Sequence, residues 1–160
     1  MPLISIVQWP DRRLATPCAA VGSVTPAVRD LAADMLETMY AAPGRGLAAP
    51  QVGVLQRIFV MDVMWKDGPR SPMVLIDPEL VWQAETRVVG PEGCLSIPGV
   101  LADVERAASI RVVWTELSGD RVEAVLDGFA AICAQHELDH LDGIVTLDRL
   151  SAEDRAKVLA

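Results

Sequence analysis

The sequence has few histidines, few cysteines and few aromatic residues. It carries two His and three Cys, and Phe, Trp and Tyr together make up 4% of its 160 residues. An odd number of widely spaced cysteines argues for free thiols and against a disulfide framework. The shortage of aromatic rings means that aliphatic side chains must fill most of the core. With 51% hydrophobic and 22% charged residues, the composition is that of a folded globular chain, and the length predicts a single domain over residues 1–160.

Long hydrophobic runs and basic clusters are also missing. The stretch Ile58–Met61 ends at Asp62, and no run approaches the roughly 20 residues of a membrane helix. The N-terminus has no basic segment ahead of an apolar one, which predicts a cytoplasmic protein without a secretory signal. The formal net charge is −8, and no Lys/Arg cluster offsets it, which argues against direct binding of nucleic acid.

Helices are expected near both ends of the chain. Residues 25–41 should be helical, because Thr25 is a good N-cap, Pro26 stands at the first helical position, and apolar residues then recur at helical spacing. A second helix is expected over residues 127–141, and a short last one begins at Ser151, where the sequence resembles a capping box.

The middle of the chain is expected to form strands. Residues 90–99 hold three glycines and two prolines, which predicts irregular structure there. The order of helix, several strands and helix favours an α+β fold with a mostly antiparallel sheet. The predicted strands cover residues 57–63, 73–76, 81–89, 109–115 and 121–126, the last two forming a hairpin.

Both histidines of the chain, His136 and His140, are four residues apart. On an α-helix this spacing places the two rings on one face, one turn apart, where they can share a metal ion. Glu137 lies next to His136 and can act on a metal-bound water, as the general base of many zinc hydrolases does. The alternative is a solvated helix end with histidines and acids. The metal site is favoured because the helix is expected to be buried on that side by Phe129, Ile132 and Cys133.

The third ligand stays open at this point. A catalytic zinc-type site usually has three protein ligands and one open position. A distant Glu, as in metalloproteases, is one option, and a cysteine is the other. Cys94 lies in a glycine-containing segment that can approach the helix, and Cys133 shares the helix face with His136. Cys18 has nothing catalytic around it and is expected to be structural.

A glycine-rich segment, Gly44–Gln51, follows the first predicted helix. Its glycines permit close backbone approach. It lacks the Lys-Ser/Thr of a phosphate loop, and a helix precedes it, unlike the dinucleotide-binding fingerprint. It is either a tight turn packed on the core, or a loop whose Gln51 donates a hydrogen bond to a substrate.

Three segments, taken in order, resemble the peptide deformylase family. That family carries Gly-x-Gly-x-Ala-Ala-x-Gln, Glu-Gly-Cys-x-Ser and Gln-His-Glu-x-x-Asp-His-Leu, which here are Gly44–Gln51, Glu92–Ser96 and Gln135–Leu141. The match extends to Val52–Val54 and Ile97–Gly99, so that it spans roughly residues 5–150 of the chain. The resemblance implies an α+β fold in which mostly antiparallel strands pack around a central metal-bearing helix.

The resemblance also implies residue roles. Cys94, His136 and His140 would bind the metal, and Glu137 would be the general acid and base. The Gln51 side-chain amide and the Leu95 backbone N–H would hold the oxyanion. An ion pair of Glu92, with Arg106 as its expected partner, would steady the Cys94 loop. The substrate pocket would be lined by Arg45, Gly46, Leu47, Gly93, Ile132 and Cys133.

The implied activity is removal of the N-formyl group from the N-terminal formylmethionine of nascent peptides, with release of formate. The implied cofactor is one divalent ion, Fe²⁺ as the native metal, with Zn²⁺, Ni²⁺ or Co²⁺ able to substitute. The expected partners are the formylated nascent peptide and, in a transient contact, the ribosome. No membrane partner is expected, and the protein is expected to be a monomer.

Several positions depart from the family pattern. Arg45 occupies a loop position where an aliphatic residue is usual, and Leu101 stands where many members have an Arg that contacts the substrate backbone. Residues 148–160 carry three acidic and three basic side chains, which does not support docking on the ribosome by charge. The alternatives are therefore an amidase on another N-acylated substrate and a deformylase-like protein with little turnover. A metalloprotease would need a third His or Glu ligand, and the chain has no third His.

Overall fold

The computed structural model describes residues 3–160, and over this range three α-helices and seven strands form. Helix α1 (Pro26–Ala41) comes first, and helices α2 (Gly128–Leu141) and α3 (Ala152–Leu159) end the chain. The strands are β1 (Gly46–Ala48), β2 (Ile58–Met61), β3 (Met73–Gln83), β4 (Arg87–Cys94), β5 (Ile97–Ala107), β6 (Ser109–Thr115) and β7 (Arg121–Asp127). The short 3₁₀ helices are η1 (Arg12–Ala15), η2 (Ala49–Val52) and η3 (Thr146–Arg149).

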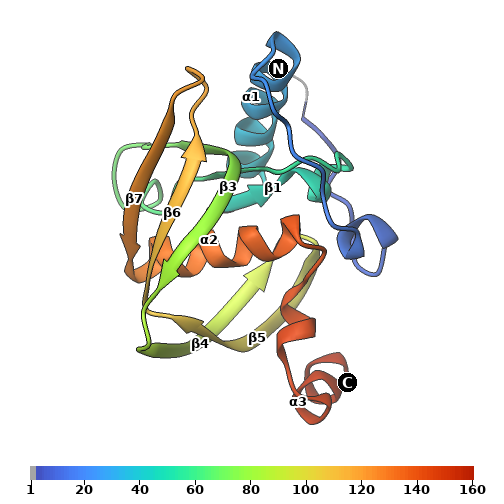
Figure 1. The fold of residues 1–160 in the computed structure, drawn as a ribbon. Helices are drawn as coiled ribbons and strands as arrows, with labels where there is room; N and C mark the ends of the chain where they lie inside the picture. Colours follow the sequence, from blue (N-terminus) through green and yellow to red (C-terminus); the bar gives the residue numbers. More distant parts are fainter. Residues whose placement is uncertain (1–2) are drawn as a thin grey trace.

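Helix α2 lies between two antiparallel sheets (Figure 1). The larger sheet has five strands in the order β1-β2-β3-β6-β7, and the smaller one is the β4–β5 hairpin. Helix α2 contacts β1, β2, β6 and β7 of the first sheet and β5 of the second. This arrangement confirms the predicted α+β fold with antiparallel strands around a central helix.

Strand β2 is buried on both faces, and its alternating side chains join two clusters of the core. Ile58 and Val60 pack with the apolar residues of α1, whereas Phe59 and Met61 pack with those of α2. Because successive side chains of a strand point to opposite faces, a strand between two helices must be apolar throughout. The clusters are largely aliphatic, as the scarcity of aromatic residues predicts.

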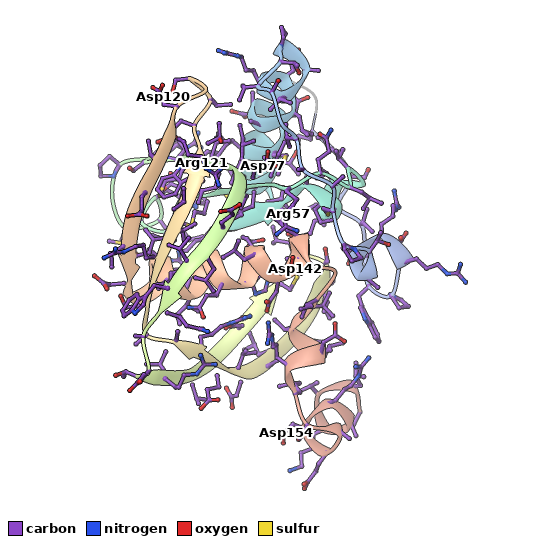
Figure 2. All side chains as sticks on the ribbon, viewed as in Figure 1. Arg57, Asp77, Asp120, Arg121, Asp142 and Asp154 are labelled. Carbon is purple, nitrogen blue, oxygen red and sulfur yellow. The ribbon has the colours of Figure 1, made fainter. Side chains whose placement is uncertain are left out.

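The end of α2 is fastened to the large sheet by one arginine. Arg57, next to the start of β2, donates from Nη1 to the Leu141 carbonyl at 3.0 Å and to Asp142 Oδ1 at 3.0 Å (Figure 2). A cation at the C-terminal end of a helix also interacts favourably with the helix dipole. This contact helps to fix the position of the helix that carries both histidines.

The helix predictions are confirmed to within one residue. Thr25 caps α1 by accepting a hydrogen bond from the Val28 N–H at 3.3 Å, and Pro26 is the first helical residue. Ser151 caps α3 by accepting from the Asp154 N–H at 3.1 Å. Within the described residues, each helix is too short or too polar to cross a lipid bilayer.

Two predictions around the small sheet are wrong. The stretch 81–89 is not one strand, because β3 runs on to Gln83 and the chain turns before β4 begins at Arg87. Residues 90–99 are not irregular, because they form most of β4, a tight turn and the start of β5. The prolines fit there since each strand of a two-stranded sheet has a free edge that needs no N–H. In β5 the alternation of apolar and polar residues that indicates a strand is interrupted by Arg106, a charged residue at a buried position.

Candidate metal centre

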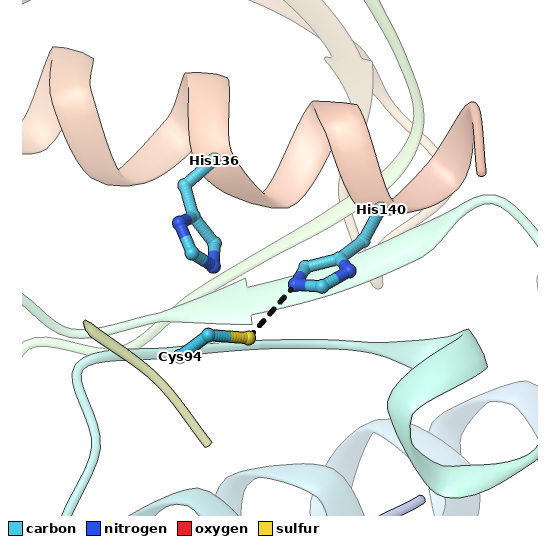
Figure 3. A group of neighbouring side chains, drawn as sticks. All are labelled: Cys94, His136 and His140. Carbon is cyan, nitrogen blue, oxygen red and sulfur yellow. Dashed lines mark hydrogen bonds between the residues drawn. The ribbon is translucent and has the colours of Figure 1, made fainter. Parts of the chain in front are cut away.

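Two imidazoles and one sulfur converge below helix α2. His136 and His140 project from the same face of the helix toward Cys94, the last residue of β4 (Figure 3). One ligand atom from each residue lies within 4.8 Å of the other two, and His140 Nε2 is 3.4 Å from Cys94 Sγ. A sulfur with two nitrogens is a ligand set typical of zinc and iron sites that leave one position open.

Cys94 reaches the helix because the β4–β5 hairpin is irregular at this residue. The register of the two strands shifts between Gly93 and Cys94, after which Cys94 pairs with Ile97 across a two-residue turn. Such a shift turns a side chain out of the direction that regular pleating gives it. The thiol therefore points to the histidines and lies buried, with 9% of the residue exposed.

A carboxylate orients the first histidine. His136 Nδ1 lies 3.0 Å from Glu92 Oε1, so that Nδ1 donates to the carboxylate and Nε2 is free for a metal. Burial alone would raise the pKa of Glu92, but the hydrogen bonds from Arg106 and His136 outweigh burial and hold this pKa below its ordinary value. Glu92 is therefore an anion that fixes the tautomer of the ring.

Arg106 and Arg149 complete an ionic network behind the histidines. Arg106 donates to both oxygens of Glu92, at 2.9 and 2.8 Å, and its Nη1 donates to Asp139 Oδ2 at 2.6 Å. Arg149 donates to both oxygens of Asp139, at 3.0 and 2.6 Å. Asp139 lies between the two histidines in sequence, so the network supports the helix turn that carries both of them. No role for Asp139 or Arg149 follows from the sequence alone, because nothing local shows that their side chains meet Arg106.

The two histidines differ in their electrostatic environment. Burial lowers the pKa of His140 well below its ordinary value, which keeps this ring neutral, as a metal ligand must be. Burial also acts to lower the pKa of His136, but the charge of Glu137 and the hydrogen bonds with Cys94 and Glu92 raise it well above its ordinary value. The surroundings of His136 thus favour a positive charge, which fits a bound cation.

Glu137 is a buried carboxylate beside these residues. It is 4% exposed, and its Oε1 has no hydrogen-bond partner among residues 3–160. Burial raises the pKa of Glu137 to about 7, while the charge of His136 acts in the opposite direction. A group with a pKa near neutrality can both accept and return a proton at neutral pH.

Gly46 lets β1 pass close to Glu137. A Cβ added at Gly46 would lie 2.5 Å from Glu137 Oε2 and 2.8 Å from Cys133 Sγ, which no side chain could tolerate without moving the carboxylate. Cys133 itself stays outside the cluster of three ligand atoms, and its Sγ lies 3.7 Å from the Arg45 carbonyl oxygen. Spacing alone left Cys94 and Cys133 as candidates for the third ligand, and the structure brings Cys94 to the histidines.

A cavity of about 630 Å³ opens onto this cluster. Phe129 was expected to be buried, which is wrong, because it is 52% exposed and lines the cavity. Leu47 does not line it, since its side chain is fully buried in the core beside α1. Gly44, Lys66 and Phe129 also line the cavity, which was not expected from the sequence. The residues with an expected role that do line it are Arg45, Gly46, Gln51, Glu92, Gly93, Cys94, Leu95, Leu101, Ile132, Cys133, His136 and Glu137.

Two hydrogen-bond donors lie at the wall of the cavity. The Gln51 side chain is fixed by the Ala48 N–H, which donates to Oε1 at 2.9 Å, and its Nε2 lies 3.1 Å from Ser96 Oγ and 3.6 Å from Cys94 Sγ. No acceptor for the Leu95 backbone N–H is found within residues 3–160. The Leu95 donor is therefore free, and the Gln51 amide is held beside the Cys94 sulfur.

Comparisons with known proteins agree with this site. A family model described as polypeptide deformylase matches residues 3–156. A peptide deformylase of Alkalilimnicola ehrlichii is 48% identical over 158 residues, which cover 99% of this chain and 88% of that protein. A peptide deformylase of Synechococcus elongatus, solved in complex with actinonin, superposes with a TM-score of 0.94 at 38% identity, covering 99% of this chain and 87% of that one.

A second solved structure, of a peptide deformylase from Ehrlichia chaffeensis in complex with actinonin, gives a TM-score of 0.93 at 39% identity over 99% of this chain and 95% of that one. Sequence and structure therefore agree with the resemblance carried by the three ordered segments. The chain belongs to the polypeptide deformylase family, a family of hydrolases.

Proposed function

We propose that the chain is a metal-dependent hydrolase that removes the N-formyl group from the N-terminal formylmethionine of nascent peptides and releases formate. One observation carries the proposal. The Cys94 sulfur and two imidazoles converge at a cavity, beside the buried carboxylate of Glu137, whose Oε1 has no partner among the described residues. Family membership supports the same reaction.

Cys94, His136 and His140 would hold one divalent ion. We infer Fe²⁺ as the native ion from the family resemblance. Zn²⁺, Ni²⁺ or Co²⁺ could take its place, because ligand sets of nitrogen and sulfur accept several metals. When bound, such an ion lowers the pKa of a water molecule and polarises the formyl oxygen.

Glu137 would move the protons of the reaction. It accepts a proton from the water whose oxygen bonds to the formyl carbon, and it returns this proton to the amine nitrogen as the C–N bond breaks. The products are formate and a peptide with a free N-terminal amine. The pKa of about 7 that burial gives Glu137 suits both steps.

Leu95 and Gln51 would stabilise the negative charge that develops on the formyl oxygen. The free Leu95 N–H is available without rearrangement, whereas the Gln51 amide must direct one N–H away from its present partners, Ser96 and Cys94. One donor of this kind is typically worth about 3 kcal/mol of the activation barrier.

The close contact of Gly46 with Glu137 suits a small acyl group. A formyl carbon carries only a hydrogen, whereas an acetyl group adds a methyl where β1 and Glu137 already lie against each other.

The proposed location of the reaction is the cytoplasm, and the proposed substrate is the nascent peptide. The active species would be a single-domain monomer that makes a transient contact with the ribosome. A net charge of −8 disfavours direct binding of nucleic acid.

The test is formate release from formyl-Met-Ala-Ser and acetate release from acetyl-Met-Ala-Ser, using protein purified anaerobically with Fe²⁺. We expect turnover of the formyl peptide and a loss of about 10²–10⁴-fold in kcat for Glu137→Gln with unchanged metal content. Glu85→Gln, at an exposed position, is the matched control and should leave kcat unchanged. A metallated protein that is silent on the formyl peptide, or a fully active Glu137→Gln variant, would overturn the proposal.

A further inference from the structure

Two cationic side chains, Arg45 and Lys66, line the cavity. Arg45 directly precedes Gly46, the residue that lies against Glu137, and Lys66 belongs to the loop between β2 and β3. Both line the cavity, and the Arg45 guanidinium carbon lies 5.4 Å from the centre of the Phe129 ring, which lines it too. The guanidinium thus lies over an aromatic ring at the cavity wall, and the residue after Arg45 lies against the proposed catalytic carboxylate.

The Arg45 guanidinium is left without strong partners. Its Nε is buried and has no hydrogen-bond partner within residues 3–160. Its nearest acid, Asp67, is 71% exposed and lies 3.9 Å away, too far for a hydrogen bond. Lys66 forms no ion pair within the same range of residues. A guanidinium offers five N–H donors in a rigid fork that matches a carboxylate, and here these donors are uncommitted.

The acids of the cavity do not neutralise these two cations. Glu92 is paired with Arg106 and His136, and Glu137 lies buried in the role proposed above. Strand β5 adds apolar surface through Leu101, which is 68% exposed. The cavity of a chain with net charge −8 therefore carries two cations that a peptide carboxylate would meet.

We propose that Arg45 and Lys66 form a specificity site that favours formylated peptides with an Asp or Glu side chain in the first two residues after formylmethionine. The proposal rests on the deformylase function proposed above. Arg45 would bind the carboxylate through two parallel N–H···O hydrogen bonds, and Lys66 would add a second charge. Phe129 would hold the guanidinium in place by the cation–π contact.

The experiment compares peptides that differ only in a side-chain carboxylate. Formyl-Met-Glu-Ser and formyl-Met-Ala-Glu are compared with their Gln counterparts, and all have amidated C-termini so that no terminal carboxylate competes. Kd is measured by calorimetry with metal-loaded Glu137→Gln protein, and also with the wild type if it does not turn the peptides over, while kcat/KM is measured with the wild type. We expect at least one Glu peptide to be favoured about tenfold in both quantities, as for one charge-assisted contact, with a smaller preference at high salt.

Variants separate the specific contact from general attraction by charge. Arg45→Met should abolish the preference, Arg45→Lys should retain part of it, and Lys66→Met should reduce it. Arg29→Met removes one positive charge from the exposed face of α1 and should change nothing. A Glu-to-Gln ratio near one for both positions in the wild type overturns the proposal, as does a preference that survives Arg45→Met with Lys66→Met also unchanged.

The two proposals fail in different ways. If the protein turns over formyl peptides without regard to the carboxylate, the specificity site is wrong and the proposed function stands. If no formyl peptide is turned over, the proposed function is wrong. The ratio of Kd values for the wild type then still decides whether this cavity selects a carboxylate.

Discussion

Two arginines near the same cavity are used in opposite ways. Arg106, behind the proposed metal ligands, is 5% exposed in its side chain and hydrogen-bonds to Glu92 and Asp139. Arg45, at the cavity wall, is 33% exposed in its side chain and has only a distant acid, Asp67. A buried charge is tolerated only when it is fully paired, and pairing fixes its geometry. A half-exposed charge can remain unpaired and free for a ligand.

The ionic network around Arg106 supports the site, whereas the cavity wall around Arg45 can contact a ligand. The paired charges run from His136 through Glu92, Arg106 and Asp139 to Arg149, and each contact restricts the position of the next. This network orients His136, one of the proposed metal ligands, and supports the helix that also carries His140. The cavity wall around Arg45 has no comparable network, so that its charge can recognise a substrate without disturbing the metal site.

Removing Arg106 should have the largest effect. Arg106→Met leaves Glu92 and Asp139 with buried charges that have lost a partner, and we expect the free energy of unfolding to fall by about 3–5 kcal/mol. Metal affinity should fall by about 10–100-fold, as is typical when a group that orients a metal ligand is lost. Urea unfolding and metal titration measure the two effects.

The control for this variant is Arg111→Met on β6. Arg111 is 49% exposed in its side chain and lies 3.9 Å from Glu123. Such surface pairs contribute about 0–1 kcal/mol. If Arg106→Met were no more destabilising than Arg111→Met, the network would not support the site.

Arg149→Met should have an intermediate effect. The Arg149 side chain is 44% exposed, so its pair with Asp139 is screened by solvent, and Asp139 keeps Arg106 as a partner. We expect a loss of about 1 kcal/mol or less in the free energy of unfolding. The measurement is the same urea titration, with Lys157→Met on α3 as the surface control. If Arg149→Met lowered the free energy of unfolding as much as Arg106→Met does, Arg106 would not be the main contributor to the stability of the network.

Arg45→Met should have the smallest effect on stability. Its guanidinium makes no hydrogen bond that the folded state would lose, and the methionine can still cover Phe129. We expect the free energy of unfolding to stay within about 0.5 kcal/mol of the wild type, while the choice between Glu and Gln peptides changes. A strongly destabilised variant would mean that Arg45 supports the fold and that the contrast with Arg106 is wrong.

The fold was predictable where the pattern is local. The caps at Thr25 and Ser151 and the spacing of apolar residues locate the helices, because these signals act within a few residues. The prediction failed at β4 and β5, where glycines, prolines and the buried Arg106 hide the alternation of a strand. A charged residue at a buried strand position is explained only when the structure shows that Glu92 and Asp139 pair with Arg106.

The site was predictable to a similar extent. Half of the residues that line the cavity belong to the three family segments. Leu47, Asp139, Arg149 and Lys66 show the limit. Leu47 lies in the same motif as Gly46 but points into the core, since neighbouring residues of a strand face opposite sides. Asp139 belongs to the third family segment, but its pairing with Arg106 and Arg149 appears only in the structure. Arg149 and Lys66 reach the network or the cavity from positions that no motif distinguishes.

The sequence by itself determined that His136 and His140 share one face of a helix, because the geometry of a helix is local and four residues make about one turn. It also determined the family, because three ordered segments rarely occur together by chance. The resemblance implied Cys94 as the sulfur ligand, but only the tertiary structure brings this sulfur to the histidines and decides which arginine is buried and which remains free. These outcomes depend on contacts between segments far apart in the chain, such as Cys94 with His140, and on how completely the surrounding elements exclude water.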